Sequence, residues 1–181
     1  MPRYVALLRA INVGGHTVRM SDLRDHFEAM AFTGVSTFIA SGNVVFDSPG
    51  TSTRKLEATI ERGLKASLGY EVGTFIRTLP ELEAVAAYRP FPAAMLTAAG
   101  SSLYVMFLAE PVPGSTRRRL QALRTDLDDF HARGREVYWY CRGKLTDSLV
   151  NSTALSKAIG APTTMRNVTS LRKLVAKYRD A

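Results

Sequence analysis

The chain turns at Arg9-Ala10-Ile11-Asn12-Val13-Gly14-Gly15, where the apolar run of residues 4–10 ends in a pair of glycines. A second turn, Ser41-Gly42-Asn43, separates the apolar runs 35–40 and 43–47. Short apolar runs bounded by Gly, Ser and Asn are typical of strands joined by turns. These stretches therefore predict three strands, the last two forming a hairpin, and the rest of the fold follows from their order.

Two amphipathic segments complete the first half of the chain. Residues 22–31 have apolar side chains at helical spacing behind Ser21, a good N-cap. Residues 51–69 repeat this pattern, with Ser52 or Thr53 as the cap, and end at a glycine. With a further strand at 72–77, the predicted order is βαββαβ, the ferredoxin-like unit.

The second half repeats this order. Its predicted elements are strands at 103–108, 130–132, 137–141 and, weakly, 163–165, with helices from Ser115 through Leu127, from Ser148 or Ser152 to Gly160, and over 169–179. We therefore expect an α+β protein with a duplicated ferredoxin-like fold, two βαββαβ-type halves in which helices pack on antiparallel sheets. The expected divisions are residues 1–78, a connecting helix and loop at 79–100, and 101–181.

Composition narrows the class of protein. The chain has 181 residues, 46% of them hydrophobic, and a single cysteine, Cys141, in a predicted strand. It contains no apolar run of the ~18 residues that a membrane-spanning helix needs and begins with no signal pattern. We therefore expect a cytoplasmic protein without a membrane partner. The net charge is +8, and residues 101–181 hold 14 Lys and Arg against 7 Asp and Glu. A basic half attracts polyanions in general, and the alternative is a solvated basic face without such a partner.

The first turn carries the main candidate for a binding site. Arg9 is expected at the end of its strand, with Asn12 and the backbone amides of Gly14 and Gly15 just beyond it. Backbone amides that converge beside an arginine bind anions such as phosphate or carboxylate. The alternative is a tight connection in which Asn12 bonds its own backbone.

The second turn has the same two interpretations. Ser41, Gly42 and Asn43 are either ligand contacts or a hairpin corner in which Gly and Asn take left-handed angles. Antiparallel pairing of the first and third strands would bring Asn12 and Asn43 together. Two further candidates, Arg166 and Asn167, precede the last helix, where Asn167 or Thr169 can cap the helix beside a bound anion.

A nucleic-acid interface is the alternative function. Tyr138, Tyr140 and Arg142 share one face of a predicted strand and Lys144 follows it, so the tyrosines could stack on bases beside a phosphate contact. Packing of Trp139 in the core with solvent-facing tyrosines explains the same pattern. A protein-interaction scaffold is a further alternative.

No catalytic constellation is evident. The three histidines lack metal-ligand spacing, Cys141 has no neighbouring histidine, and no nucleophile elbow or carboxylate cluster is present. The sequence therefore predicts neither a metal nor a cofactor, and it assigns no reaction and no oligomeric state.

The chain resembles the bacterial family called domain of unknown function 1697 over nearly its whole length. The segments that carry the resemblance are Leu8-Arg9-Ala10-Ile11-Asn12-Val13-Gly14-Gly15, Phe38-Ile39-Ala40-Ser41-Gly42-Asn43-Val44-Val45-Phe46, Arg89-Pro90-Phe91, Gly143-Lys144-Leu145 and Thr164-Met165-Arg166-Asn167. The family usually continues with a tryptophan and a threonine where this chain has Val168 and Ser170. The resemblance implies a duplicated ferredoxin-like fold and supplies no activity.

Overall fold

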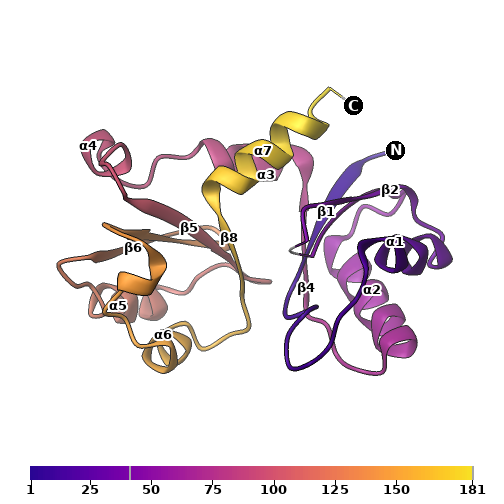
Figure 1. Cartoon of the computed structure of the whole chain (residues 1–181), viewed down its shortest axis with the longest axis horizontal. Coiled ribbons are helices and arrows are strands. Elements are labelled where there is room, and N and C mark those ends of the chain that lie inside the picture. The colour runs from indigo at the N-terminus through magenta and orange to yellow at the C-terminus, as the bar shows by residue number, and fades with distance from the viewer. Residues whose placement is uncertain (41, 181) are drawn as a thin grey trace. The chain divides into compact units, whose positions relative to one another are not determined.

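A computed structural model describes residues 1–40 and 42–180 (Figure 1). The first six strands and helices are β1 (Arg3–Leu8), α1 (Met20–Ala29), β2 (Thr33–Phe38), β3 (Asn43–Asp47), α2 (Thr53–Leu68) and β4 (Thr74–Thr78). They form one antiparallel sheet in the order β2-β3-β1-β4, with α1 and α2 on one face. This is the βαββαβ arrangement that the sequence predicts.

The second sheet is built in the same way. After α3 (Leu79–Ala87), the elements are α4 (Ala93–Leu96), β5 (Ser102–Phe107), α5 (Gly114–Gln121), β6 (Asp128–Arg133), β7 (Glu136–Cys141), a short 3-10 helix (Leu145–Asp147), α6 (Ser152–Ile159), β8 (Thr164–Asn167) and α7 (Val168–Tyr178). The sheet order is β6-β7-β5-β8, again antiparallel. The expected fold class, α+β with two ferredoxin-like halves, is confirmed.

The chain divides into two compact units. The first contains Met1–Glu83 and the C-terminal residues from Leu174, and the second contains Ala84–Lys173. The division therefore falls within α3 and within α7.

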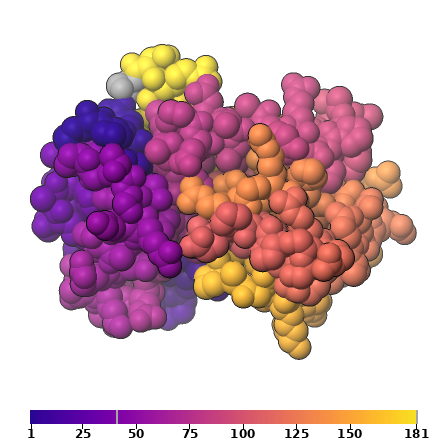
Figure 2. Space-filling model, turned by 180° about the vertical axis from the view of Figure 1, so that it is seen from behind, coloured from indigo at the N-terminus to yellow at the C-terminus, as the bar shows by residue number. Residues whose placement is uncertain are grey.

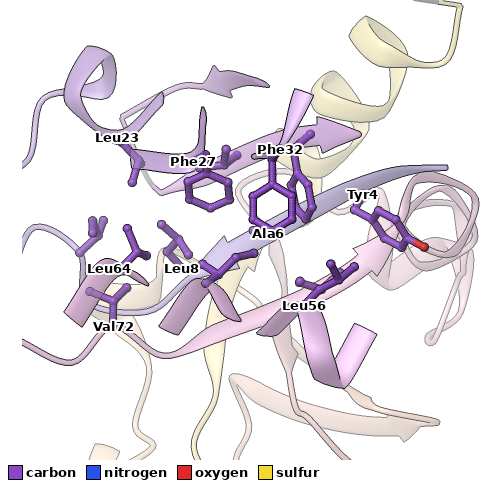
Figure 3. Close-up of a cluster of buried hydrophobic side chains, with 14 of the residues drawn as sticks. Tyr4, Ala6, Leu8, Leu23, Phe27, Phe32, Leu56, Leu64 and Val72 are labelled. Carbon is purple, nitrogen blue, oxygen red and sulfur yellow. The ribbon is translucent and has the colours of Figure 1, made fainter. Parts of the chain in front are cut away.

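The core of the first unit lies between its sheet and its two long helices. Figure 3 shows Leu23 and Phe27 of α1 pointing toward Leu8 of β1, with Leu64 of α2 on the same side. All four side chains are at most 2% exposed. Burying an aliphatic or aromatic side chain stabilises a fold by ~1.5–3 kcal/mol, so this layer accounts for much of what holds the unit together.

The helix ends differ in how well the sequence predicts them. α2 is capped as expected, because Ser52 Oγ accepts from the backbone N–H of Lys55 and Gly69 follows in the left-handed conformation. α1 is not. It begins at Met20 behind Arg19, which makes no side-chain cap, and Ser21 lies inside the helix. The prediction of Ser21 as the cap is wrong, because the N-cap position is Arg19, two residues earlier.

α5 ends earlier than predicted, at Gln121 instead of Leu127. Beyond it, the hydroxyl of Thr125 accepts from the backbone N–H groups of Leu127 and Asp128 and donates to the Asp128 carboxylate at 2.7 Å. Such local side-chain bonds offer the backbone an alternative to the helix. β6 consequently begins at Asp128, before the predicted strand.

Each sheet has an edge strand whose backbone groups are bonded to side chains of a neighbouring helix. In the first unit, the N–H groups of Thr74 and Ile76 on β4 donate to Glu61 and Glu57 of α2, both at 2.9 Å. The N–H of Thr78 donates to Glu81 at 2.7 Å. These bonds satisfy the donors that an edge strand otherwise presents to other strands.

In the second unit the capped strand is β6, and the groups involved are its carbonyls. Arg117 Nη1 of α5 donates to the carbonyl oxygen of Ala132 at 2.7 Å, and Gln121 Nε2 donates to that of Phe130 at 3.1 Å. In both units, therefore, a helix of the same unit covers a sheet edge.

Candidate functional site

The first candidate lies at one end of the sheet of the first unit, where the loop after β1 meets the loop between β2 and β3. Leu7 pairs with Asn43 across β1 and β3, and the backbone N–H of Leu8 donates to the carbonyl oxygen of Gly42 at 2.9 Å. A Cβ atom placed on Gly42 would lie 3.0 Å from Cγ2 of Ile11. Antiparallel pairing thus brings the two loops together, as predicted.

Side chains close the loop after β1 on itself. Asn12 Oδ1 accepts from the backbone N–H of Val18 at 2.8 Å. The hydroxyl of Tyr70 donates to the carbonyl oxygen of Ile11 at 2.9 Å, and its ring stacks on His16 with 3.8 Å between the ring centroids. The carboxamide oxygen of Asn12 therefore stabilises the loop, which agrees with the interpretation of this stretch as a tight connection.

Asn43 differs from its expected conformation. It is the first residue of β3, is 2% exposed, and donates from Nδ2 to the carbonyl oxygen of Phe38 at 3.2 Å. Among the described residues of this connection, Ile39, with φ 49°, and Gly42, with φ 73°, are left-handed. The prediction of a left-handed Asn43 is wrong, because pairing with β1 already extends its backbone. Ser41 lies outside the described residues.

Arg9 and the two glycines retain groups that face outward. Arg9 is exposed, its backbone N–H donates to Gly73 at 2.7 Å, and its guanidinium makes no hydrogen bond or ion pair with the described part of the chain. Gly14 and Gly15 have φ values of 64° and 83°, and no atom lies within 4 Å of a Cβ built on either. The loop therefore presents the exposed guanidinium of Arg9 and, at Gly14 and Gly15, a backbone that no neighbouring atom covers.

Arg166 and Asn167 belong to the second unit. Arg166 is 9% exposed, and its Nη1 donates to Thr164 Oγ1 and to the carbonyl oxygen of Met165, both at 2.8 Å. Burial lowers the pKa of Arg166 to about 10, so the guanidinium stays charged at neutral pH. Asn167 Oδ1 accepts from the backbone N–H of Thr169 at 2.8 Å, the cap of α7 that the sequence predicts.

Asn167 also lines a pocket of about 430 Å³ within the second unit. The walls come from the end of α3, the segment before β5 that includes α4, the first residues of β5, the end of β7 and the start of α7. Figure 2 shows the segment between α3 and β5, in pink, at the surface of the molecule. The lining residues are Ala87, Arg89, Ala93, Leu96, Thr97, Ser101, Ser102, Leu103, Tyr140, Asn167, Val168, Thr169 and Arg172.

Two guanidinium groups give this pocket its charge. Arg172 donates from Nε to the carbonyl oxygen of Ala86 at 3.1 Å, which anchors the side chain and leaves its terminal N–H groups for a ligand. Arg89 is exposed and forms no side-chain hydrogen bond or ion pair with residues 1–40 or 42–180. None of the lining residues that the structure describes is acidic.

The expected stacking surface on β7 is absent. Tyr138 is 1% exposed, donates its hydroxyl to the carbonyl oxygen of Val85 at 3.0 Å, and lies 5.4 Å from the ring of Tyr88. Tyr140 is 5% exposed and packs against Phe91. The prediction that these tyrosines face solvent is wrong, because α3 and the segment that follows it cover them.

The remaining residues of that strand follow the prediction more closely. Trp139 is buried in the second unit's core, as expected, and Cys141 is fully buried at the end of β7. Burial raises the pKa of the Cys141 thiol. Arg142 and Lys144 are exposed beyond the strand.

The contact between His131 of β6 and Tyr88 had no signal in the sequence. The Tyr88 hydroxyl lies 3.1 Å from Nε2 of His131, and the guanidinium of Arg133 lies 4.2 Å from the centre of the Tyr88 ring. Burial and the positive charges of Arg117 and Arg133 lower the pKa of His131, against the opposing effect of Asp129. His131 is consequently neutral at pH 7.

Within the described parts of the chain, no group of three His, Cys, Asp or Glu side chains could hold a metal ion. Nor does any described helix combine the length and apolarity needed to cross a membrane.

These features define a protein of two ferredoxin-like α+β units, the second of which holds a basic pocket. The chain belongs to the family described as "Protein of unknown function (DUF1697)", whose model matches residues 1–138. The structure is similar to that of the conserved bacterial protein SP0830 from Streptococcus pneumoniae, with a TM-score of 0.72, 21% sequence identity and 99% of each chain covered. At this identity the likeness shows a shared fold. No curated protein matches the chain.

Proposed function

We propose that the protein binds a small organic anion in the pocket of the second unit, between Arg89 and Arg172. The observation that carries this proposal is a pocket of about 430 Å³ that receives two arginines and no described acidic side chain. Pockets for small ligands commonly measure ~300–1,000 Å³. Guanidinium groups bind phosphate and carboxylate through paired hydrogen bonds, so both anion classes suit the site.

The charge of the unit supports the same ligand class. Residues 84–173 contain 13 Lys and Arg against 6 Asp and Glu. Such an excess raises the local concentration of anions and their rate of association. The apolar side chains of Leu96, Leu103 and Val168 supply the rest of the wall, which favours an anion attached to a carbon skeleton over an inorganic ion.

The sequence predicts anion binding at two loops of the first unit, the loop after β1 and the loop between β2 and β3. Exposed Arg9 and the open backbone at Gly14 and Gly15 support that location. Against it, Asn12 and Asn43 use their carboxamides within the protein. The pocket beside Arg89 is therefore the better-supported position, and the two locations are separable by experiment.

The test is an NMR titration of the full chain with four probes: glycerol 3-phosphate, propyl phosphate, malate and succinate. We expect at least one probe to shift the amide resonances of Asn167 and Thr169 with saturable behaviour. Arg89→Ala should weaken this binding ~10-fold or more, because a hydrogen bond to a charged group contributes ~1.5–3 kcal/mol. Arg118→Ala is the matched control, since Arg118 is exposed on α5 and does not line the pocket.

The outcomes separate the two locations. If Arg9→Ala abolishes binding and Arg89→Ala does not, the anion binds at the loops of the first unit. If none of the four probes shifts any resonance at millimolar concentration, the proposed function is wrong.

Nucleic-acid binding remains the second candidate, because the basic excess of the second unit favours it. The burial of Tyr138 and Tyr140 leaves phosphate contacts, including those of Arg142 and Lys144, as its support. Affinity for a polynucleotide should then fall steeply with salt, since each phosphate contact releases counterions. Absence of retention on single- or double-stranded DNA at low salt would dismiss this candidate.

A further inference from the structure

Five residues that line the pocket carry a hydroxyl group, and the three that lie between α4 and the start of β5 donate their protons inside the protein. Thr97 Oγ1 donates to the carbonyl oxygen of Ala93 at 2.8 Å, and Ser101 Oγ donates to that of Ala98 at 2.7 Å. Ser102 Oγ likewise donates to the carbonyl oxygen of Gly143 at 2.7 Å. A hydroxyl has one proton and two lone pairs, so while these bonds hold, the three oxygens act as acceptors toward a ligand.

The groups that can donate to a ligand come from other segments. Arg89, two residues after the end of α3, and Arg172 on α7 carry the charged N–H groups. Asn167 accepts through Oδ1 from the backbone of Thr169, so its Nδ2 is the group left to donate. The groups that donate to a ligand therefore come from the residues after α3 and from β8 and α7. The hydroxyl oxygens that accept from a ligand come from the segment between α4 and the start of β5.

A bare anion matches only half of this arrangement. It would pair with Arg89 and Arg172 but offer no proton to the hydroxyl oxygens, and polar groups that lose water without a new partner weaken binding. An anion that carries hydroxyl or amino groups on adjacent carbons pairs with both sets. Sites built to pair with a ligand hydroxyl discriminate strongly against analogues that lack it.

Resting on the proposed function, we infer that the ligand is a hydroxylated or amino-bearing organic anion, such as a polyol phosphate or a hydroxy acid. Its anionic group lies against Arg89 and Arg172. Its hydroxyl or amino protons point to Thr97, Ser101 and Ser102.

The experiment compares two matched pairs of probes by isothermal titration calorimetry. Glycerol 3-phosphate and propyl phosphate share a charge and a three-carbon chain but differ in hydroxyls, and malate and succinate differ by one hydroxyl. We expect the hydroxylated member of the pair that binds to be at least ~10-fold tighter. Equal affinities within each pair would overturn the inference and leave the proposed function standing. Failure of all four probes would overturn both.

Variants identify the responsible side chains. Thr97→Val combined with Ser101→Ala removes two acceptor oxygens, so it should reduce the ratio of affinities within the pair and leave the unhydroxylated probe unchanged. Arg89→Ala should instead weaken both members by the same factor. A ratio that the double variant leaves unaltered, with its melting curve like that of the parent chain, would overturn the inference.

Discussion

The indole Nε1 of Trp139 donates a hydrogen bond to the carboxylate of Asp128 at 2.9 Å. The same carboxylate accepts from the hydroxyls of Thr125 and Ser148 at 2.7 Å and from the backbone N–H of Leu149 at 3.2 Å. Asp128 is 2% exposed. One buried charge thus ties the start of β6 to β7 and to the segment that leads into α6.

Replacing Asp128 should destabilise the second unit. Asp128→Ala leaves four donors without their acceptor, and we expect the free energy of unfolding to fall by ~2–4 kcal/mol. Urea unfolding followed by the fluorescence of Trp139, the chain's single tryptophan, measures this directly. Asp126→Ala is the control, because Asp126 is exposed two residues away and its loss should cost less than ~0.5 kcal/mol. A smaller effect at Asp128 than at Asp126 would contradict the role of this carboxylate.

The same group makes stability depend on acid pH. Burial alone would raise the pKa of Asp128, but its hydrogen bonds from Thr125, Ser148, Trp139 and Leu149 lower it below the ordinary value of 3.8. A lowered pKa in the folded state means that the stabilisation is complete above the ordinary value and is lost as the pH falls below it. Unfolding free energies of the parent chain and Asp128→Asn should therefore converge with acidification. Parallel curves below about pH 4 would be inconsistent with this.

His131 should titrate below its ordinary value of 6.5. Burial and the neighbouring arginines disfavour the charged ring, so stability is highest above pH 6.5 and declines as the pH falls toward the lowered pKa. NMR titration of the ring protons measures the midpoint. Arg117→Ala should raise it, because the ring loses a neighbouring positive charge that disfavours its protonation. A midpoint above 6.5 in the parent chain would refute this account.

The edge of β4 depends on two glutamates. Glu57→Ala and Glu61→Ala should each lower the free energy of unfolding by ~1 kcal/mol, since each exposes a backbone N–H of β4. The double variant should also associate at high concentration, which light scattering detects, because uncapped edges pair with other strands. Glu28→Ala on α1 is the matched control, being an exposed helical glutamate that is not bonded to a strand. Equal behaviour of the three single variants would argue against edge capping.

Contact between the two loops of the first unit can be tested at Gly42. Gly42→Ala would introduce a Cβ 3.0 Å from Ile11 and 3.2 Å from Leu8 at a φ of 73°. Gly69→Ala is the control, with a similar φ of 82° and nothing within 4 Å. Each substitution should lower the free energy of unfolding by ~1–2 kcal/mol, because alanine disfavours the left-handed conformation. Any additional loss at Gly42 measures the crowding of the new Cβ against Ile11 and Leu8. Identical losses would mean that the loops can separate.

The sequence predicts the fold well because its signals are local. The cap at Ser52, the left-handed Gly69 and the apolar spacing of α2 all lie within one segment. Predictions fail where distant segments decide the outcome. Tyr138 alternates along its strand like a surface residue, yet α3 and the residue Tyr88 that follows it cover Tyr138, whose hydroxyl donates to the carbonyl oxygen of Val85 in α3.

The candidate site shows the same limit. Pairing of β1 with β3 was enough to predict that the loops near Ile11 and Gly42 meet. The pocket was not predictable in this way, because Arg89 and Arg172 are far apart in the chain, and the segment Arg89-Pro90-Phe91 carries the family resemblance without implying a role for Arg89. Asn167 was found through its capping role, and its position in the pocket comes from β8 pairing with β5.

A polypeptide that carries two copies of one topology risks exchanging equivalent strands between the copies while it folds, a known failure of repetitive proteins. In this chain the N–H groups of β4 are already engaged by α2, and the carbonyls of β6 by α5. In each copy, side chains of a helix therefore occupy hydrogen-bonding groups of an edge strand. Strands of the other copy would otherwise be able to pair with those groups. A chain with a duplicated fold avoids such exchange when the hydrogen-bond partners of each strand lie close to it in the sequence.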